Sequence, residues 1–345
     1  MAENTLSLNP YLALPKVELH RHLEGSLRLS TMLDIARKHG VTVPISLLNL
    51  SGLVQVQDKD PMTFSNFLEK FKTLRLFYRS PDVIHRVTRE AVEDAARDNI
   101  RYLELRFTPV ALSRAEGFPL HDVMNWVLDS TQNAAKDFGI KVNVIASVNR
   151  HESPDLAEQV AWLAVSHKDQ GMVGLDLAGN EAEFKSNPFH GIFKEAKQSG
   201  MHITIHAGEW GPAENVRDAI EHIGAERIGH GVRVLEDESV TALAKERGTI
   251  FEVCVTSNFQ SGVVDRLENH PLPKMLERGL KVTVNTDDPS VSRINLSHEF
   301  QTVHEKLNVP MDALKKATLL AAESAFLPEN EKTELVQNIR KELER

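Results

Sequence analysis

The sequence contains a single cysteine, Cys254, among its 345 residues. One cysteine excludes an intrachain disulfide framework, and it also excludes a zinc site built on paired thiolates. Histidine and carboxylate side chains therefore remain as the candidate metal ligands. Cys254 itself follows an apolar run, where we expect it to be buried as a small hydrophobic residue.

Positive charge is also scarce, because 40 lysines and arginines face 49 aspartates and glutamates, which gives a formal net charge of -9. This balance provides no general attraction to nucleic acids or anionic membranes, and it favours a small-molecule partner. No run of about 18 apolar residues is present, and segment 1–15 has neither the basic start nor the apolar stretch of a secretory signal. We therefore expect a cytoplasmic protein with no nucleic-acid or membrane partner; the sequence indicates no oligomeric state.

The chain lacks internal repeats, low-complexity tracts and Pro/Gly-rich linkers that would mark a second domain. Its hydrophobic content of 41% allows a large core, and 345 residues is near the upper end of the usual size of one barrel domain. We therefore predict one domain that spans residues 1–345.

Short apolar, β-branched runs alternate along the chain with segments of helical character, which is typical of a parallel sheet with crossover helices. Eight continuous alternations favour a closed (β/α)8 TIM barrel over an open sheet, because a closed barrel leaves no edge strand exposed. The expected strands are residues 17–19, 100–106, 141–148, 172–177, 203–206, 227–229, 250–253 and 281–285. The expected helices include residues 81–98, 121–138, 155–167, 189–199, 215–223 and 240–247.

A helical insertion separates the first two expected strands. It contains an amphipathic stretch, residues 63–78, whose apolar side chains are spaced as on one face of a helix; this is typical of core packing. Those side chains are Phe64, Phe67, Leu68, Phe71 and Leu74. After the eighth strand we expect two or three further helices, of which the last, residues 329–345, is charged and is expected to be a solvated surface helix.

Two histidines, His20 and His22, follow the first expected strand. Side chains two residues apart in an extended segment point to the same side, so one metal ion could bind both. A third histidine, His206, ends the fifth expected strand, and the carboxylic acid Glu209 comes three residues later. The pattern at each strand end is compatible with a metal site, although paired histidines alone are also common on protein surfaces.

Two more polar clusters end the sixth and eighth expected strands. His230 is flanked by two glycines, which let the backbone approach a ligand closely and make this histidine a candidate general base. Asp287 and Asp288 are adjacent carboxylates before a proline, a pattern that alone often marks only a helix cap. A closed barrel, however, brings all four clusters to one rim, where active sites of this fold lie.

Three histidines and one aspartate suit a zinc ion that keeps one position open for water. Such an ion lowers the pKa of its water from 15.7 to about 7, so the expected chemistry is hydrolytic. Four other histidines, His151, His167, His222 and His270, are expected to be ordinary surface or cap residues.

The clusters, together with segments 14–20, 176–179 and 256–262, resemble the adenosine deaminase family of zinc-dependent amidohydrolases over nearly the whole chain. The resemblance implies one Zn²⁺ per chain, bound by His20, His22, His206 and Asp287. It implies that Glu209 protonates the purine ring, that His230 orients and deprotonates the zinc water, and that Asp288 contacts the ring. It further implies a backbone hydrogen bond from Gly179 to the base and an apolar lid formed by Phe64, Phe67 and Leu68.

The activity that this resemblance implies is hydrolytic deamination of adenosine and 2'-deoxyadenosine to inosine and ammonia, in purine salvage. One residue departs from the pattern: Glu24 stands where members most specific for adenosine usually carry aspartate, and its longer side chain reaches toward the sugar. Glutamate here also resembles relatives that act on free adenine or on modified adenine nucleosides. Segment 256–262 is more similar to the bacterial adenosine enzymes, so we expect adenosine and keep adenine and modified nucleosides as alternatives.

Two other classes of protein are alternatives to a deaminase, namely a relative that binds metal without catalysis and a barrel hydrolase with two metals. A relative that binds metal without catalysis would normally lack a ligand or the acid, and this sequence retains all of them. A barrel hydrolase with two metals usually needs a modified lysine on the fourth strand, where residues 174–177 contain none. Deamination of polynucleotides is excluded, because those zinc enzymes require a Pro-Cys-x-x-Cys segment.

Overall fold

The computed structural model describes residues 9–344. Residues 1–8, part of the segment on which the expected cytoplasmic location rests, and Arg345 of the expected last helix lie outside the described residues. The strands are β1 (Lys16–His22), β2 (Ile100–Phe107), β3 (Lys141–Asn149), β4 (Met172–Ala178), β5 (His202–Ala207), β6 (Arg227–His230), β7 (Ile250–Val253) and β8 (Lys281–Val284).

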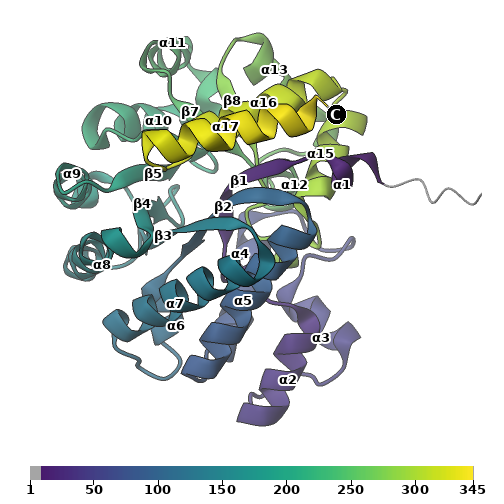
Figure 1. Ribbon diagram of the computed structural model, residues 1–345, viewed down its shortest axis with the longest axis vertical. Helices are drawn as coiled ribbons and strands as arrows, with labels where there is room; N and C mark the ends of the chain where they lie inside the picture. Colours follow the sequence, from purple (N-terminus) through teal and green to yellow (C-terminus); the bar gives the residue numbers. More distant parts are fainter. Residues whose placement is uncertain (1–8, 345) are drawn as a thin grey trace, which may run out of the picture.

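Each strand pairs in parallel with the next along the chain, from β1 to β8 (Figure 1). The ring is completed by a bridge between Arg21 and Asp287, with hydrogen bonds from His22 N to Asp287 O at 2.8 Å and from Asp287 N to His20 O at 2.9 Å. This arrangement confirms the predicted (β/α)8 TIM barrel. It also extends β1 to His22, three residues beyond the expected end, because the His22 amide is bonded across the closure.

Helices cover the outside of the barrel, and most lie within a few residues of their expected positions. Where helix 189–199 was expected, a short 3-10 turn, Asn187–Phe189, is followed by α9. The expected helix 215–223 begins at Ala213 and ends in a π-helical turn, Ala219–Ile223. The outer helices are α5 (Pro81–Arg97), α6 (Pro109–Ser113), α7 (Leu120–Phe138), α8 (Pro154–Ser166), α9 (His190–Gln198), α10 (Ala213–Asp218), α11 (Glu238–Arg247), α12 (Val255–Gln260) and α13 (Leu272–Glu277).

The insertion between β1 and β2 is helical, as expected. It contains α2 (Leu29–His39), α3 (Leu47–Val54), α4 (Phe64–Leu74) and the 3-10 turn Arg75–Phe77. In Figure 1, α2 and α3 project at the end of the molecule opposite the yellow C-terminal helices. Helix α4 begins where the Thr63 side chain accepts a hydrogen bond from Asn66 N, and its Phe67 and Leu74 are buried.

Up to residue 344, where the description ends, four helices follow β8, where two or three were expected: α14 (Pro289–Ser292), α15 (Leu296–Glu305), α16 (Met311–Glu323) and α17 (Glu329–Leu343). The last helix is not only a solvated surface element. Its Leu335 and Ile339 are buried in a cluster with Val17 and Tyr102, near the start of β1 and β2. Helices α16 and α17 therefore pack at the N-terminal end of the barrel, whereas α14 begins directly after Asp288, at the rim that carries the candidate site.

Phe326 makes further contacts at the same end of the barrel. Phe326 N donates a hydrogen bond to Glu104 at 2.6 Å, and the Arg227 guanidinium lies 3.4 Å from the centre of the Phe326 ring. Among residues 9–344, no helix combines the length and the apolar character required to cross a membrane.

Candidate metal and active site

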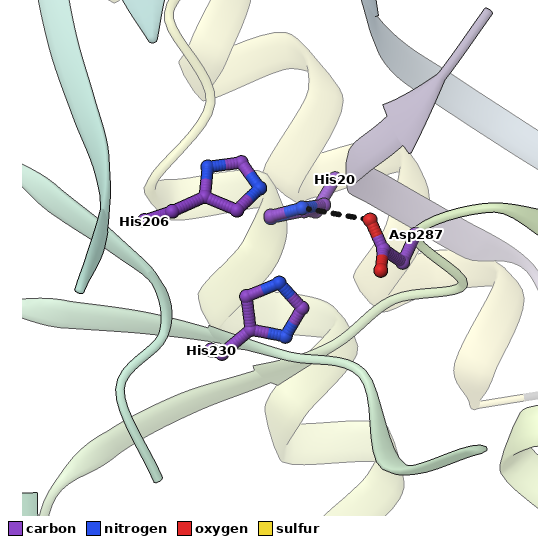
Figure 2. Close-up of side chains that lie close together, drawn as sticks. All are labelled: His20, His206, His230 and Asp287. Atoms are coloured by element: carbon purple, nitrogen blue, oxygen red, sulfur yellow. Dashed lines mark ion pairs between the residues drawn. The ribbon is translucent and has the colours of Figure 1, made fainter. Parts of the chain in front are cut away.

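The four polar clusters predicted from the sequence meet at the C-terminal rim of the barrel. Donor atoms of His20, His206, His230 and Asp287 all lie within 4.8 Å of one another, and their side chains face a common space in Figure 2. His22 belongs to the same group of side chains, because its Nε2 lies 3.3 Å from His206 Nε2. The barrel thus assembles residues that are more than 260 positions apart in the sequence, since β1 and β8 close the ring.

Distances between donor atoms fit a small four-coordinate cation. His20 Nε2 and His22 Nε2 each lie 3.3 Å from Asp287 Oδ1, and the two imidazoles of His22 and His206 are separated by the same distance. Tetrahedral bonds of about 2.0–2.1 Å to zinc place neighbouring donors about 3.3–3.4 Å apart. Within the described chain, the fully buried His20 Nε2 also lacks any hydrogen-bond partner, so its lone pair is left for a metal.

The outer nitrogens of two of these histidines are held by buried carboxylates. His20 Nδ1 lies 2.8 Å from Glu252 Oε2, and His206 Nδ1 lies 2.8 Å from Asp176 Oδ1. An Nδ1–H that donates to a carboxylate leaves Nε2 as the free acceptor, which is the tautomer that a metal requires. The Arg106 guanidinium forms ion pairs with both carboxylates, at 2.8 Å from Glu252 Oε2 and 3.4 Å from Asp176 Oδ2.

The protonation states of Asp287 and His22 favour metal binding, whereas the pKa of His20 is raised, because its contacts with Asp287 and Glu252 outweigh the effect of burial. Burial would raise the pKa of Asp287, but the contact with His20 Nε2 at 3.3 Å and the neighbouring imidazoles hold that pKa well below its ordinary value. Burial lowers the pKa of His22 well below the ordinary value for histidine. The aspartate is therefore ionised and the imidazole neutral, as metal ligation requires.

The backbone at this rim adopts conformations that the barrel imposes on two site residues. His230 and Asp287 have φ values of 60° and 68°, in the left-handed region that residues other than glycine rarely occupy. At Gly25, an added β-carbon would lie 1.9 Å from Asp288 Oδ1, so this position needs glycine.

Glu209 stands on the loop after β5, and a buried carboxylate fixes that loop. Glu181 accepts backbone hydrogen bonds from Gly208 at 2.9 Å, from Glu209 at 2.6 Å and from Trp210 at 2.8 Å. The Glu209 side chain is buried, and its Oε2 lies 3.7 Å from His230 Nε2. Burial, with the charges of Asp287 and Glu181, raises the Glu209 pKa well above its ordinary value, so Glu209 is poised to donate a proton.

Asp288 is the second buried acid of the rim. Its Oδ1 has no hydrogen-bond partner in residues 9–344. Burial and the charges of Asp287, Glu24 and Glu209 raise the Asp288 pKa well above its ordinary value. The two adjacent aspartates therefore differ in protonation, with Asp287 among the histidines and Asp288 facing the pocket.

A pocket opens beside the cluster, and most of the predicted substrate-binding residues line it. These are His22, Glu24, Phe67, Leu68, Gly179 and Asp288, and the lining also contains the predicted metal-binding or catalytic residues His206, Glu209, His230 and Asp287. Phe64 is not in the lining; it packs on Trp210, which does line the pocket, with 5.6 Å between ring centres. Glu24 Oε1 accepts a hydrogen bond from Thr108 N at 2.7 Å, and its buried Oε2 has no partner in the described part of the chain.

Sequence reasoning missed the residues that support this site. Asp176 was part of a recognised segment but had no role, while Arg106 and Glu252 lie in apolar strands, where their charge was the available signal. A charge on a central strand must be paired, because burying an isolated charge is very costly. Of the four histidines expected to be surface or cap residues, His151 and His222 are exposed, whereas His167 and His270 are buried and each lies at the C-terminal end of a helical segment.

Comparisons with known proteins agree with this geometry. The sequence matches the family described as "Adenosine deaminase" over residues 15–342. It is 37% identical to an adenosine deaminase of Clostridium perfringens over 328 residues, which cover 95% of this chain and 98% of the relative. Adenine deaminase from Arthrobacter aurescens has a similar structure, with a TM-score of 0.89 and 26% identity over 96% of this chain and all of the other.

Two further solved structures are similar. An amidohydrolase from Burkholderia ambifaria, with bound Zn, has a TM-score of 0.88 and 25% identity over 99% of this chain and 96% of the other. The Arabidopsis N6-mAMP deaminase has a TM-score of 0.86 and 26% identity over 97% of this chain and all of the other. The fold, the sequence match and the identity to curated relatives lead to one conclusion: this chain belongs to the adenosine deaminase family.

Proposed function

We propose that this chain catalyses the hydrolytic deamination of adenosine and 2'-deoxyadenosine to inosine and ammonia, with one zinc ion per chain. The observation that carries the proposal is the place of Glu209, a buried acid with a raised pKa whose carboxyl oxygen lies 3.7 Å from His230 beside the histidine cluster. The sequence identity to adenosine deaminases supports adenosine as the substrate.

The zinc ligands in this proposal are His20, His22, His206 and Asp287. The separations of 3.3 Å join these four residues, from His20 and His22 to Asp287 and from His22 to His206. His230 is also within reach, but its Nε2 faces Glu209, and we assign it to the substrate side of the site. When bound, zinc supplies the Lewis acidity that makes a water molecule nucleophilic near neutral pH.

The protein groups act on the purine around this centre. Attack at C6 makes a flat aromatic carbon tetrahedral and moves electrons onto N1, so a protonated carboxyl must deliver a proton to N1. Glu209 has the protonation state for this step. His230 holds the attacking oxygen and Asp288 contacts the ring, while the backbone of Gly179, in the pocket lining, bonds the base.

Phe67 and Leu68 of α4 form the apolar wall of the pocket, with Phe64 packed behind Trp210. An apolar cover excludes water and strengthens the polar contacts beneath it. We assign these three residues to a lid over the substrate. We also propose that residues 1–345 act as one domain, and that the activity serves purine salvage in the cytoplasm.

Glu24 supports a second candidate for the substrate. Its buried Oε2 is free to accept a hydrogen bond inside the pocket, and an acid at this place could bind a group other than ribose. Adenine or a modified adenine nucleoside is therefore the alternative substrate, and the structural similarity to an adenine deaminase and to an N6-mAMP deaminase supports it.

One assay tests both candidates. The loss of purine absorbance is followed with adenosine, 2'-deoxyadenosine, adenine and 5'-substituted adenosines, and kcat/KM is compared across the set. The proposal expects adenosine and 2'-deoxyadenosine to rank first. Preference for adenine or for a substituted nucleoside would select the alternative, and no turnover of any of them by zinc-loaded protein would reject both. Zinc close to two per chain would instead favour a binuclear hydrolase.

A further inference from the structure

A line of three buried side chains runs from the backbone of α13 to His230. Leu272 N lies 3.1 Å from His270 Nδ1, His270 Nε2 lies 3.2 Å from Asn258 Oδ1, and Asn258 Nδ2 lies 3.0 Å from His230 Nδ1. All three side chains are at most 3% exposed. Neither His270 nor Asn258 has a part in the function proposed above.

The backbone N–H of Leu272, at the α13 end of this line, determines the direction of every hydrogen bond in it. A backbone N–H can only donate, so His270 Nδ1 must accept and carries no proton. Burial lowers the pKa of His270 to about 3, so its imidazole is neutral and its single proton is on Nε2. That proton is donated to Asn258 Oδ1, and the amide nitrogen of Asn258 is therefore the group that faces His230.

The same reasoning determines the state of His230. The Asn258 amide donates, so His230 Nδ1 accepts, and the proton of the neutral imidazole must be on Nε2. The opposite orientation of the amide would bring its NH2 group against the His270 Nε2–H and leave buried donors without acceptors. His230 Nε2 is 3.7 Å from Glu209 Oε2, which is too long for a hydrogen bond, so this N–H is available to a ligand.

We propose that Asn258 and His270 are positioning residues that lock His230 in the Nε2–H tautomer, so that His230 gives a hydrogen bond to the attacking oxygen. This inference rests on the proposed function for the identity of that oxygen. A hydrogen bond from this N–H holds the attacking oxygen in the geometry required for attack at C6, and a misplacement of about 1 Å can cost about 10²-fold in rate. His230 then acts as a hydrogen-bond donor, in place of the base that the family resemblance implied; the proton of the attacking water would pass to solvent, because a metal at this site would lower the pKa of that water to about 7.

The variant Asn258→Asp reverses the tautomer without moving the side chain. A carboxylate only accepts, so it keeps the hydrogen bond from His270 Nε2–H and accepts a second one from His230 Nδ1–H. The single proton of neutral His230 is then on Nδ1, and Nε2 is bare. His270→Gln is the matched control, because its amide NH2 replaces the imidazole Nε2–H as the donor to Asn258. His270→Leu removes that donor.

The direct readout is the ¹⁵N spectrum of histidine-labelled, zinc-loaded protein at about pH 9, well above the ordinary imidazole pKa of about 6.5. Protonated and bare ring nitrogens resonate in separate regions, and His230→Gln identifies the signals of His230. We expect a bare Nδ1 and a protonated Nε2 in the wild type and in His270→Gln, and the reverse pattern in Asn258→Asp.

Turnover of adenosine gives a second readout on the same proteins. We expect kcat to fall about 10²-fold in Asn258→Asp, as for a reacting atom displaced by about 1 Å, with KM little changed. His270→Leu should lose about 10- to 100-fold and His270→Gln less than about 10-fold. Zinc should remain at one per chain in all three variants.

A wild-type spectrum with a protonated Nδ1 would overturn the inference, as would an Asn258→Asp spectrum with unchanged His230 signals. Wild-type kcat in Asn258→Asp with a reversed tautomer would also overturn the donor role. If the wild type deaminates no purine, the proposed function fails, whereas the spectrum still decides whether Asn258 and His270 set the tautomer.

Discussion

Asp176 Oδ1 lies 2.8 Å from His206 Nδ1, and both side chains are buried at the centre of the barrel. The contact turns His206 Nε2 toward His22 and the rest of the cluster. The Asp176 pKa is well below its ordinary value, because the charges of His206 and Arg106 and the hydrogen bond from His206 outweigh the effect of burial. Asp176 thus carries a negative charge one hydrogen bond away from His206, a proposed metal ligand.

Asp176→Asn should weaken zinc binding, because the amide is a poorer acceptor and removes the charge behind His206. We expect the affinity for zinc to fall about 10- to 100-fold, as measured by competition with a chelator. Ser147→Ala is the matched control, since Ser147 donates to the other oxygen of Asp176 at 3.0 Å and does not touch the histidine. Equal zinc affinity in Asp176→Asn and the wild type would show that this contact does not tune the metal.

Glu209→Gln tests the proton donor. The variant keeps the shape of the side chain and should retain zinc and bind substrate, while kcat falls by about 10²- to 10⁴-fold because the transition state receives no proton. Glu214→Gln, on an exposed side chain at the start of α10, is the control and should leave kcat unchanged. Wild-type turnover in Glu209→Gln would exclude the assigned role.

Glu181→Gln should loosen the loop that carries Glu209. The Glu181 carboxylate accepts three backbone N–H groups and the Asn215 amide at 2.8 Å, and an amide side chain would turn a donor toward some of them. We expect a loss of about 1–3 kcal/mol in the free energy of unfolding, measured by denaturant titration, together with a lower kcat. The exposed neighbour Glu183 supplies the control, Glu183→Gln. Equal stability of the two variants would argue against this anchor.

Glu299 should give the protein a specific dependence of stability on pH. Burial raises the pKa of Glu299 to about 7 from the ordinary 4.5, against the hydrogen bonds from Thr256. The folded state therefore keeps a proton that the unfolded state releases between these values, so this contribution to stability is complete below pH 4.5 and is lost as pH rises through about 7.

The measurement compares the free energy of unfolding of Glu299→Gln and the wild type, both saturated with zinc, across this range. The amide side chain of the variant does not ionise, so the wild type should lose up to about 3 kcal/mol relative to the variant as pH rises. A difference between the two proteins that stays constant from acid to alkaline pH would mean that Glu299 does not titrate in this window.

The barrel could be predicted because the same sequence pattern, an apolar run followed by a helical segment, is repeated along the chain. Each strand is a short apolar run that the chain places before a helix, and eight repeats outweigh the ambiguity of any single run. The site clusters could be predicted for a related reason, since the parallel strands bring their carboxyl ends to one rim. His20, His206 and Asp287 therefore meet as expected, although they lie far apart in the sequence.

The supporting residues could not be predicted in the same way. Arg106, Glu252 and Asp176 take their meaning from contacts between different strands, and periodicity within one strand says nothing about a partner on another. His270 was expected at the surface or at a cap, and it does cap Leu272 N, but the fold of the β7–α13 connection buries it beside Asn258. The packing of α17 on the barrel was missed because its charged composition conceals Leu335 and Ile339.

The most direct test of the account is the zinc content of Asp287→Ala, determined by elemental analysis after dialysis against buffer that contains no metal. Asp287 is the anionic group of the proposed ligand set, and its Oδ1 lies 3.3 Å from both His20 Nε2 and His22 Nε2. We predict that the variant loses zinc and deaminase activity together, whereas the wild type retains one zinc per chain. A folded Asp287→Ala protein with a full complement of zinc would contradict the account.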